Sequence, residues 1–120
     1  MFTEDRPIFL QLADQIADDI FRGRYAEGEP VPSTNELAQM LRINPATAGK
    51  ALNTLVDRAI LEKRRGIGMF VSAGAVQTLR TERTEAFTTD YIRPLIAEAR
   101  ALGLTPEDVK RLIHQEGETP

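Results

Sequence analysis

The sequence predicts a mainly α-helical chain with a small β-hairpin, on three observations. Near the start, apolar residues recur at helical spacing, at Ile8, Leu12, Ile16 and Ile20. Two helix-start signals follow, at Ser33 and Asn44. Between residues 61 and 72, two strand-like runs flank a turn that contains glycines. We therefore expect helices, then one hairpin, then helices again.

The composition is typical of a soluble globular protein. The 120 residues carry 15 Lys and Arg against 18 Asp and Glu, a net charge of −3, and 42% are hydrophobic. The absence of cysteine excludes disulfides, a thiolate nucleophile and cysteine-ligated metal clusters. No apolar run is long enough to span a membrane, and the acidic start is not a secretory signal. We expect a cytoplasmic protein without membrane contacts.

The sequence lacks the residue groupings of an enzyme. Its single histidine, His114, has no metal-ligating or catalytic residues at suitable spacing, and we interpret it as a cation that favours a helix C-terminus. Neither a Walker-type phosphate loop nor a Rossmann glycine pattern occurs. We therefore expect no catalytic site, no metal and no cofactor.

The first helix is expected from about Pro7 to Arg22. Pro7 suits the first position of a helix, and Gly23 is a common C-terminal signal. The stretch from Tyr25 to Pro32 is rich in turn-forming residues, so we expect it to be non-helical.

Residues 33–58 predict two short helices joined by a tight turn. Ser33 with Glu36 forms a capping box, which starts a helix at Thr34 that buries Leu37, Ala38 and Leu41. Asn44 and Pro45 suit the N-cap and first position of the next helix, which runs to about Arg58.

The second of these helices has two different faces. One face is apolar and comprises Ala48, Ala51, Leu52, Leu55 and Val56. The other is small or polar and comprises Ala46, Thr47, Gly49, Lys50, Asn53 and Thr54. Two short helices, the second exposing small polar groups, indicate a helix-turn-helix.

The predicted hairpin is basic. Its strands are expected at Leu61–Arg64 and Met69–Ser72, with Lys63, Arg64 and Arg65 at and near the tip. Residues 42–65 carry a net charge of +4 and the rest of the chain carries −7. This asymmetry favours a local contact with a polyanion, although chance clustering on a solvated face would look the same. A helix-turn-helix followed by a basic hairpin is a winged helix-turn-helix.

The C-terminal third predicts two further helices. We expect a flexible joint at residues 73–75, a helix from Gln77 to Leu102 that Pro94 kinks near Asp90, and a helix from Pro106 to about Gln115. This gives a winged-helix domain at residues 1–73 and a two-helix region at residues 74–120.

Two helices of this size cannot bury both of their apolar stripes within one chain. A second copy is the simplest partner, so the helical region is expected to form a homodimer. The expected dimerisation residues are Leu79, Phe87, Ile92, Leu95, Ile96, Leu102, Val109, Leu112 and Ile113.

Several short segments between residues 7 and 72 form a pattern, namely PIFLQ (7–11), VPS (31–33), ELA (36–38), INPAT (43–47), AL (51–52), Leu55 and RRGIGMFV (64–71). Taken together, these motifs resemble the GntR family of bacterial transcriptional regulators. The Asn-Pro-x-Thr opening of the second short helix and the short C-terminal part are similar to the YtrA subfamily. The resemblance implies a winged helix that binds double-stranded operator DNA as a homodimer, and a helical pair that dimerises.

The resemblance also implies which residues meet DNA. Three residues at a helix N-terminus would face phosphate: Ser33, Thr34 and Asn35. The major groove would receive Asn44, Pro45, Ala46, Thr47 and Lys50. Lys50 would contact guanine or phosphate, and Ala46 or the Thr47 methyl group would contact thymine. The wing would comprise Arg64, Arg65, Gly66 and Gly68.

Some of these residues also have a purely structural explanation. The Thr47 hydroxyl could instead bond to its own helix backbone, and the wing glycines serve turn geometry in either case.

The chain departs from the family pattern at several positions. Asn35 replaces a usual arginine, Arg42 replaces a usual glycine, Ala48 replaces a larger aliphatic residue, and many members have arginine at the positions of Pro45 and Gly49. Arg42 is expected to have a positive φ and to reach a DNA phosphate, the alternative being a solvated surface arginine.

These observations predict a dimeric, sequence-specific DNA-binding regulator, most simply a repressor on a two-fold operator. The alternative is a winged-helix module that binds proteins and has no DNA affinity. A small-molecule effector would have room only at the dimer interface.

Overall fold

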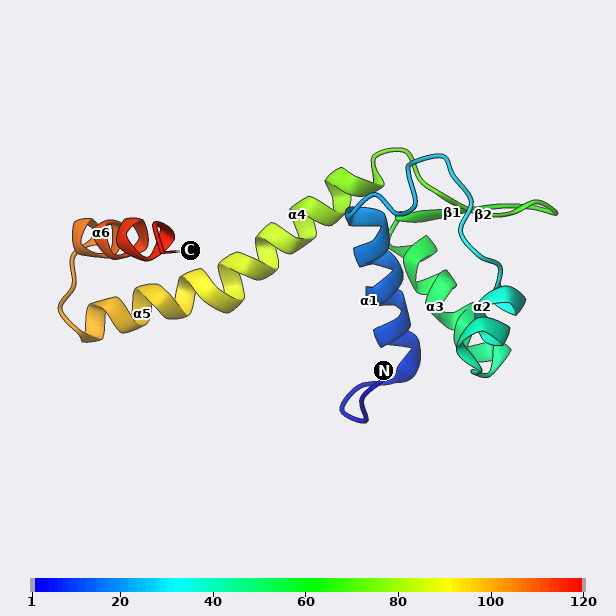
Figure 1. Ribbon diagram of the computed structural model, residues 1–120, viewed down its shortest axis with the longest axis horizontal. Helices are drawn as coiled ribbons and strands as arrows, with labels where there is room; N and C mark the ends of the chain where they lie inside the picture. Colours follow the sequence, from blue (N-terminus) through cyan, green and yellow to red (C-terminus); the bar gives the residue numbers. More distant parts are fainter. Residues whose placement is uncertain (1, 120) are drawn as a thin grey trace. The chain divides into compact units, whose positions relative to one another are not determined.

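The computed structural model describes residues 2–119 and consists of helices with one two-stranded sheet (Figure 1). Its elements are α1 (Ile8–Phe21), α2 (Thr34–Leu41), α3 (Pro45–Asp57), β1 (Leu61–Arg64), β2 (Gly68–Val71), α4 (Ala75–Phe87), the π-helical turn η1 (Thr88–Ile92), α5 (Arg93–Ala101) and α6 (Pro106–Gly117). The chain divides after Thr81 into two compact units. The predicted fold class, a mainly helical winged helix-turn-helix followed by helices, is confirmed.

The core of the first unit lies between α1, α2, α3 and the hairpin. Its largest fully buried side chains are Leu12, Ile20, Leu52, Leu55, Ile60, Leu61 and Val71. The apolar stripe of α1 and the apolar face of α3 therefore meet each other, as their spacing predicts. Leu41 and Val56, both expected inside, are only partly buried at the edge of this core.

Two of the helices α1, α2 and α3 begin at a side chain that caps the first turn. At α2, Ser33 Oγ accepts a hydrogen bond from the Glu36 N–H (3.2 Å), and the Glu36 carboxylate accepts one from the Ser33 N–H (3.0 Å). At α3, Asn44 Oδ1 accepts from the Ala46 N–H (2.8 Å), with Pro45 at the first position. Both predicted caps are confirmed. Pro7, expected at the first position of α1, is instead its N-cap residue.

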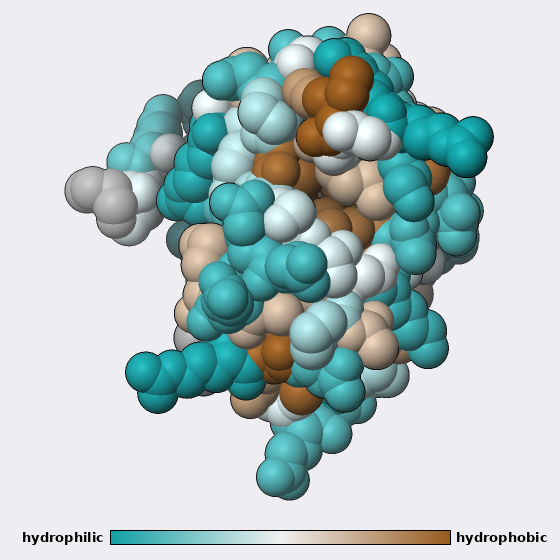
Figure 2. All heavy atoms as spheres, turned by 90° about the vertical axis from the view of Figure 1, so that its right-hand side faces the viewer, coloured by the Kyte–Doolittle hydropathy of each residue, from teal (hydrophilic) through white to brown (hydrophobic). Residues whose placement is uncertain are grey.

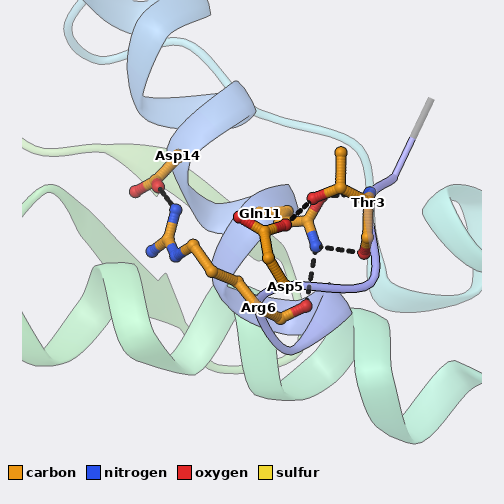
Figure 3. A network of polar contacts seen from close by, with 5 residues as sticks. All are labelled: Thr3, Asp5, Arg6, Gln11 and Asp14. Carbon is orange, nitrogen blue, oxygen red and sulfur yellow. Dashed lines mark hydrogen bonds and ion pairs between the residues drawn. The ribbon is translucent and has the colours of Figure 1, made fainter.

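A network of polar side chains ties the segment before α1 to that helix (Figure 3). The Gln11 side-chain amide donates to the carbonyl oxygens of Thr3 (2.8 Å) and Arg6 (2.7 Å), and its oxygen accepts from the Thr3 N–H (2.8 Å). Arg6 pairs with Asp14 at 2.7 Å, which raises the pKa of the guanidinium. The residues before α1 are thus attached to the helix through Gln11 and Asp14.

The hairpin is antiparallel and pairs Leu61 with Val71 and Arg64 with Gly68. Its second strand starts one residue earlier than expected, at Gly68 rather than Met69. The backbone of residues 29–31 adds a short bridge on the free edge of β2, where the Val31 N–H donates to the Met69 carbonyl at 3.0 Å. This bridge anchors the loop before α2 to the hairpin.

Helix α4 starts earlier than the sequence predicts, and the expected flexible joint is ordered. The Glu27 carboxylate accepts hydrogen bonds from the backbone N–H groups of Gly74 (2.7 Å) and Val76 (3.2 Å), so a loop far away in the sequence caps this helix. Ala75 and Leu79 are buried in the core of the first unit. Leu79 is only 2% exposed, so its assignment as a dimer contact is corrected: the first turns of α4 cover the winged-helix core.

The second unit shows the expected break near Pro94 in an unexpected form. Pro94 has no N–H and its ring crowds the carbonyl group four residues earlier, at Asp90. The backbone responds with the π-helical turn of Thr88–Ile92 in place of a simple kink. Helix α6 begins at a capping box between Thr105 and Asp108, in which the Thr105 N–H lowers the pKa of the Asp108 carboxyl group.

None of the helices that the structure describes between residues 2 and 119 is both long and apolar enough to cross a membrane.

Among residues 2–119, two non-glycine residues have a left-handed backbone. Arg42 ends α2 with φ 55° and ψ 49°, which confirms the positive φ expected from its place between two helices. Ala59, which follows α3, has φ 62° and was not anticipated. For a residue with a Cβ this conformation costs about 1 kcal/mol relative to glycine.

Arg42→Gly should therefore raise the free energy of unfolding by about 1 kcal/mol, measured by thermal and urea denaturation. Arg42→Ala is the matched control, because it removes the charge and keeps the Cβ. A gain with alanine as large as that with glycine would assign the effect to the charge and not to the backbone.

Candidate nucleic-acid interface

A groove of about 390 Å³ lies where three elements of the first unit meet. The N-terminus of α2, the exposed face of α3 and the hairpin line it, through Ser33, Thr34, Asn35, Gly49, Asn53, Lys63, Arg64, Gly66, Ile67, Gly68 and Met69. Figure 2 views the molecule from the side on which the hairpin tip and α2 lie in Figure 1, and hydrophilic residues predominate there around a few apolar patches. The groove lining holds lysine and arginine but no carboxylate, in a chain that is acidic overall.

The structure brings six of the predicted DNA-contacting residues together in this groove: Ser33, Thr34, Asn35, Arg64, Gly66 and Gly68. The other predicted contacts lie outside its lining, namely Arg42, Asn44, Pro45, Ala46, Thr47, Lys50 and Arg65. Asn53 was not predicted as a contact, although it lies on the polar face of α3. Its spacing of one helical turn from Gly49 could have identified it.

The N-terminus of α2 forms one wall of the groove. The capping box satisfies the Ser33 and Glu36 N–H groups and fixes the first turn. Because the Ser33 N–H donates to it, the Glu36 carboxyl group has a pKa below its usual range and stays ionised at neutral pH. The Glu36 charge is turned back onto the helix end and is not part of the groove lining.

The exposed face of α3 provides small and polar groups. Asn44 uses its side-chain oxygen for the cap, which leaves its amide NH₂ group for another acceptor. Ala46 is exposed and Thr47 is half-buried. Within residues 2–119 the Thr47 hydroxyl has no hydrogen bond to its own backbone, whereas Thr54 does bond to the carbonyl of Lys50 (2.8 Å). The structural explanation for Thr47, a hydrogen bond from its hydroxyl to its own helix backbone, is therefore not seen among residues 2–119.

The wing holds one of its cations firmly. The Arg64 guanidinium donates to Glu62 Oε1 from Nε (3.0 Å) and Nη2 (2.8 Å), and its Cζ lies 4.0 Å from the centroid of the Phe70 ring. Glu62 offsets part of this charge. Lys63 and Arg65 are exposed, and in the part of the chain that the structure describes neither forms an ion pair.

The tip of the wing depends on glycine. Gly66 has φ 75°, and the Ile67 N–H closes the turn onto the Arg64 carbonyl at 2.9 Å. Gly68 has φ 142° where β2 begins. Both glycines have a positive φ, which favours glycine over other residues. Ile67 lies between them at the tip, with 73% of its surface accessible.

Two predicted cations lie elsewhere on the first unit. The Lys50 Nζ lies 4.2 Å from the centroid of the Phe9 ring, so this side chain points toward α1. Arg42 is exposed at the end of α2, and its side chain has no partner among residues 2–119.

The second unit presents a largely uncovered apolar surface on α5 and α6. Of these helices only Ala99 is buried among the residues that the structure describes. A groove of about 460 Å³ is lined by Leu95, Glu98, Ala99, Leu102, Leu104, Val109, Leu112, Ile113 and Glu116. Ile96 and Phe87, also predicted as dimer contacts, are exposed, and Ile92 is half-buried. His114 pairs with Glu118 at 3.0 Å near the end of α6.

Comparisons with known proteins agree with this architecture. Residues 9–71 match the model of the family described as bacterial regulatory proteins, gntR family. The chain is 31% identical to the uncharacterized HTH-type transcriptional regulator YhcF of Bacillus subtilis, over 90% of this chain and 88% of that protein. It is 30% identical to the HTH-type transcriptional repressor YtrA of the same organism, over 91% and 83% of the two chains.

Solved structures show the same likeness. A putative transcriptional regulator of the GntR family from Bacteroides thetaiotaomicron superimposes with a TM-score of 0.76 at 30% identity, over 90% of this chain and 94% of that one. The DNA-binding domain of AraR, solved in complex with operator ORR3, superimposes with a TM-score of 0.55 at 29% identity, over 60% and 88% of the two chains.

The capping box of Glu36 should make the stability of the first unit depend on pH. The folded pKa of Glu36 lies below the unfolded value of about 4.3, so its charge stabilises the fold above that value and the contribution is lost as the pH falls through the folded pKa. Glu36→Gln should lower the melting temperature at pH 7, and the difference from wild type should vanish in acid. Glu85→Gln, an exposed change on α4, is the control and should show no such trend. A difference that persists unchanged at pH 3 would contradict a charge-dependent cap.

Proposed function

This chain belongs to the GntR family of bacterial regulatory proteins and is a DNA-binding transcriptional regulator, and we propose that it acts as a homodimeric repressor on a two-fold operator. One observation carries the DNA-binding site: the α2 N-terminus, the polar face of α3 and the wing cations line one groove without a carboxylate. A phosphate backbone needs such a surface, because affinity for DNA comes largely from cations that neutralise phosphates. We place the protein in the cytoplasm, with the DNA.

We assign the two walls of the groove different tasks. Lys63 and Arg64 in the wing wall, together with Arg65 beside the groove, contact phosphates, which position the protein without reading sequence. The α2 N-terminus, with Thr34 and Asn35, offers backbone and side-chain donors to another phosphate.

Base reading falls to α3. Asn53 can donate to and accept from an adenine edge, and Ala46 and the Thr47 methyl group suit a thymine methyl. Few long polar side chains are available on this face, because Pro45 and Gly49 stand at two of its positions. We therefore expect sequence preference to come from a small number of base positions.

The homodimer is supported by the apolar surface of the second unit. Leu102, Leu112 and Ile113 are large apolar side chains that remain exposed, and a monomer rarely leaves so many of them together. A second copy would bury the same residues by symmetry, and two winged helices would then address two half-sites. We propose that an effector, if the regulator takes one, binds at this interface.

The alternative from the sequence, a protein-interaction module without DNA affinity, draws on the net charge of −3 and on the sparse polar side chains of α3, but the match to the family disfavours it. Binding-site selection with the full chain distinguishes the DNA-binding regulator from the protein-interaction module.

Selection of binding sites from a random duplex library with the full chain, followed by fluorescence anisotropy at 50 and 200 mM salt, tests the proposal. We expect a two-fold symmetric site and an affinity that falls steeply with salt. Failure to enrich any sequence, with no salt-dependent binding to random duplex, would favour the protein-interaction module.

Arg65→Ala and Asn53→Ala should differ in kind. Loss of a phosphate contact at Arg65 should weaken binding to selected and random duplexes alike and reduce the salt slope by about one unit. Loss of a base contact at Asn53 should cost about 1–3 kcal/mol on the selected site and relax the preference at one base pair. Equal losses on both duplexes for Asn53→Ala would remove it from the base-reading set.

Leu112→Glu should convert the dimer to a monomer, because it places a charge in the proposed interface where the native side chain is 44% exposed in the single chain. Sedimentation velocity gives the mass, and operator affinity should fall as the half-sites become independent. Met40→Glu changes a more exposed apolar residue of α2, 67% accessible, and should leave the dimer intact. A dimeric Leu112→Glu protein would place the interface elsewhere.

A further inference from the structure

Lys50 lies over an aromatic ring on the α1 side of α3. Its ammonium nitrogen lies 4.2 Å from the centroid of the Phe9 ring, across the contact between α1 and α3. Phe9 is half-buried against the core, whereas Lys50 is exposed. Lys50 does not line the groove between α3 and the wing. The ring therefore holds a cation on the α1 side of α3, outside that groove.

The Phe9 ring restrains Lys50 without neutralising it. Lysine is a flexible side chain that loses much rotamer freedom when it is fixed, and an aromatic face offsets part of that loss. Within residues 2–119 no carboxylate pairs with Lys50, in contrast to Arg64, which also lies over a ring but donates to Glu62. An ammonium group with one side against a ring keeps N–H donors for an anion on the other side.

The segment before α1 is anchored to the helix next to Phe9. Gln11 and Arg6 tie the segment before α1 to the helix, through hydrogen bonds of 2.7–2.8 Å and the ion pair with Asp14 (Figure 3). A ring near the start of an anchored helix is a stable platform for a neighbouring cation. A purely structural role would not require the cation to remain unpaired.

We propose that Phe9 is a positioning residue for DNA binding, which holds the Lys50 ammonium where it contacts a backbone phosphate beside the groove rather than a base. This inference rests on the DNA-binding function proposed above and extends it. The regulator would then hold DNA at two lines of phosphates, one at the wing and α2 and one at the α1 side of α3. Phe9 does not touch DNA and acts through Lys50.

A double-mutant cycle on the full chain tests the coupling, with binding measured by anisotropy on the selected duplex and on a random duplex at several salt concentrations. Lys50→Ala should weaken binding to both duplexes and lower the salt slope by about one unit. Phe9→Leu should weaken binding about two- to fivefold, the range of an exposed cation–π contact, and have no further effect in the Lys50→Ala background. Phe9→Tyr, which keeps the aromatic ring, should bind DNA with wild-type affinity.

Two controls separate positioning from folding. Phe9→Leu combined with Arg65→Ala should be additive, since the wing does not contact this pair. Melting curves identify a variant that fails to fold, and Phe9→Met then replaces leucine. In the native protein, the ε-methylene protons of Lys50 should show upfield ring-current shifts that persist when the duplex is added.

Four results would overturn the inference while leaving DNA binding in place. Phe9→Leu could cost the same with and without Lys50, or could tighten binding, which would mean that the ring withholds the cation from DNA. The Lys50 proton shifts could disappear in the complex. A loss confined to the selected duplex with Lys50→Ala would make Lys50 a base reader. Absence of all DNA binding by the wild-type chain would instead refute the proposed function itself.

Discussion

The close contact between α1 and α3 is the constraint on which the DNA-binding side depends. Ala48 and Ala51 are fully buried on α3, and such short side chains let the two helices approach closely. Leu52 and Leu55 extend the same buried face. Because this face is committed to the core, the residues between its members must point outward. The polar, small character of the outer face of α3 is therefore a consequence of packing as well as a requirement of binding.

The charges of the first unit are separated between α1 and the groove. A chain with a net charge of −3 can approach DNA only if its negative charges lie away from the interface. Asp14, Asp18 and Asp19 are on α1, where Arg6, Arg22 and Arg24 pair with them. The groove lining holds Lys63 and Arg64 and no acid. Acidic composition and local affinity for a polyanion are thus compatible, since the field near the groove depends on the nearest charges.

Local signals in the sequence were sufficient for most of the first unit. The caps at Ser33 and Asn44 act over two or three residues, and the positive φ of Arg42 follows from the short distance between two helices, so all three could be predicted. Contacts between distant segments could not. The bonds from Glu27 to the start of α4, the burial of Leu79 and the placement of Lys50 over Phe9 each join segments whose proximity only the fold creates. The π-helical form of the break before Pro94 was likewise beyond pattern reasoning, which locates a proline clash but not how the backbone relieves it.

The burial of Leu79 fixes where this protein can be divided into exchangeable modules. Cutting at the glycine-containing segment 73–75 would strip a side chain from the core and two hydrogen bonds from Glu27. A recombination event that joined this winged helix to a different C-terminal partner would keep it intact only if the first turns of α4 travelled with it. The natural seam therefore lies inside a helix, past Thr81, where a fusion needs only helical continuity and no linker. A chimaera designed on that seam would inherit the DNA-binding unit with all its buried contacts.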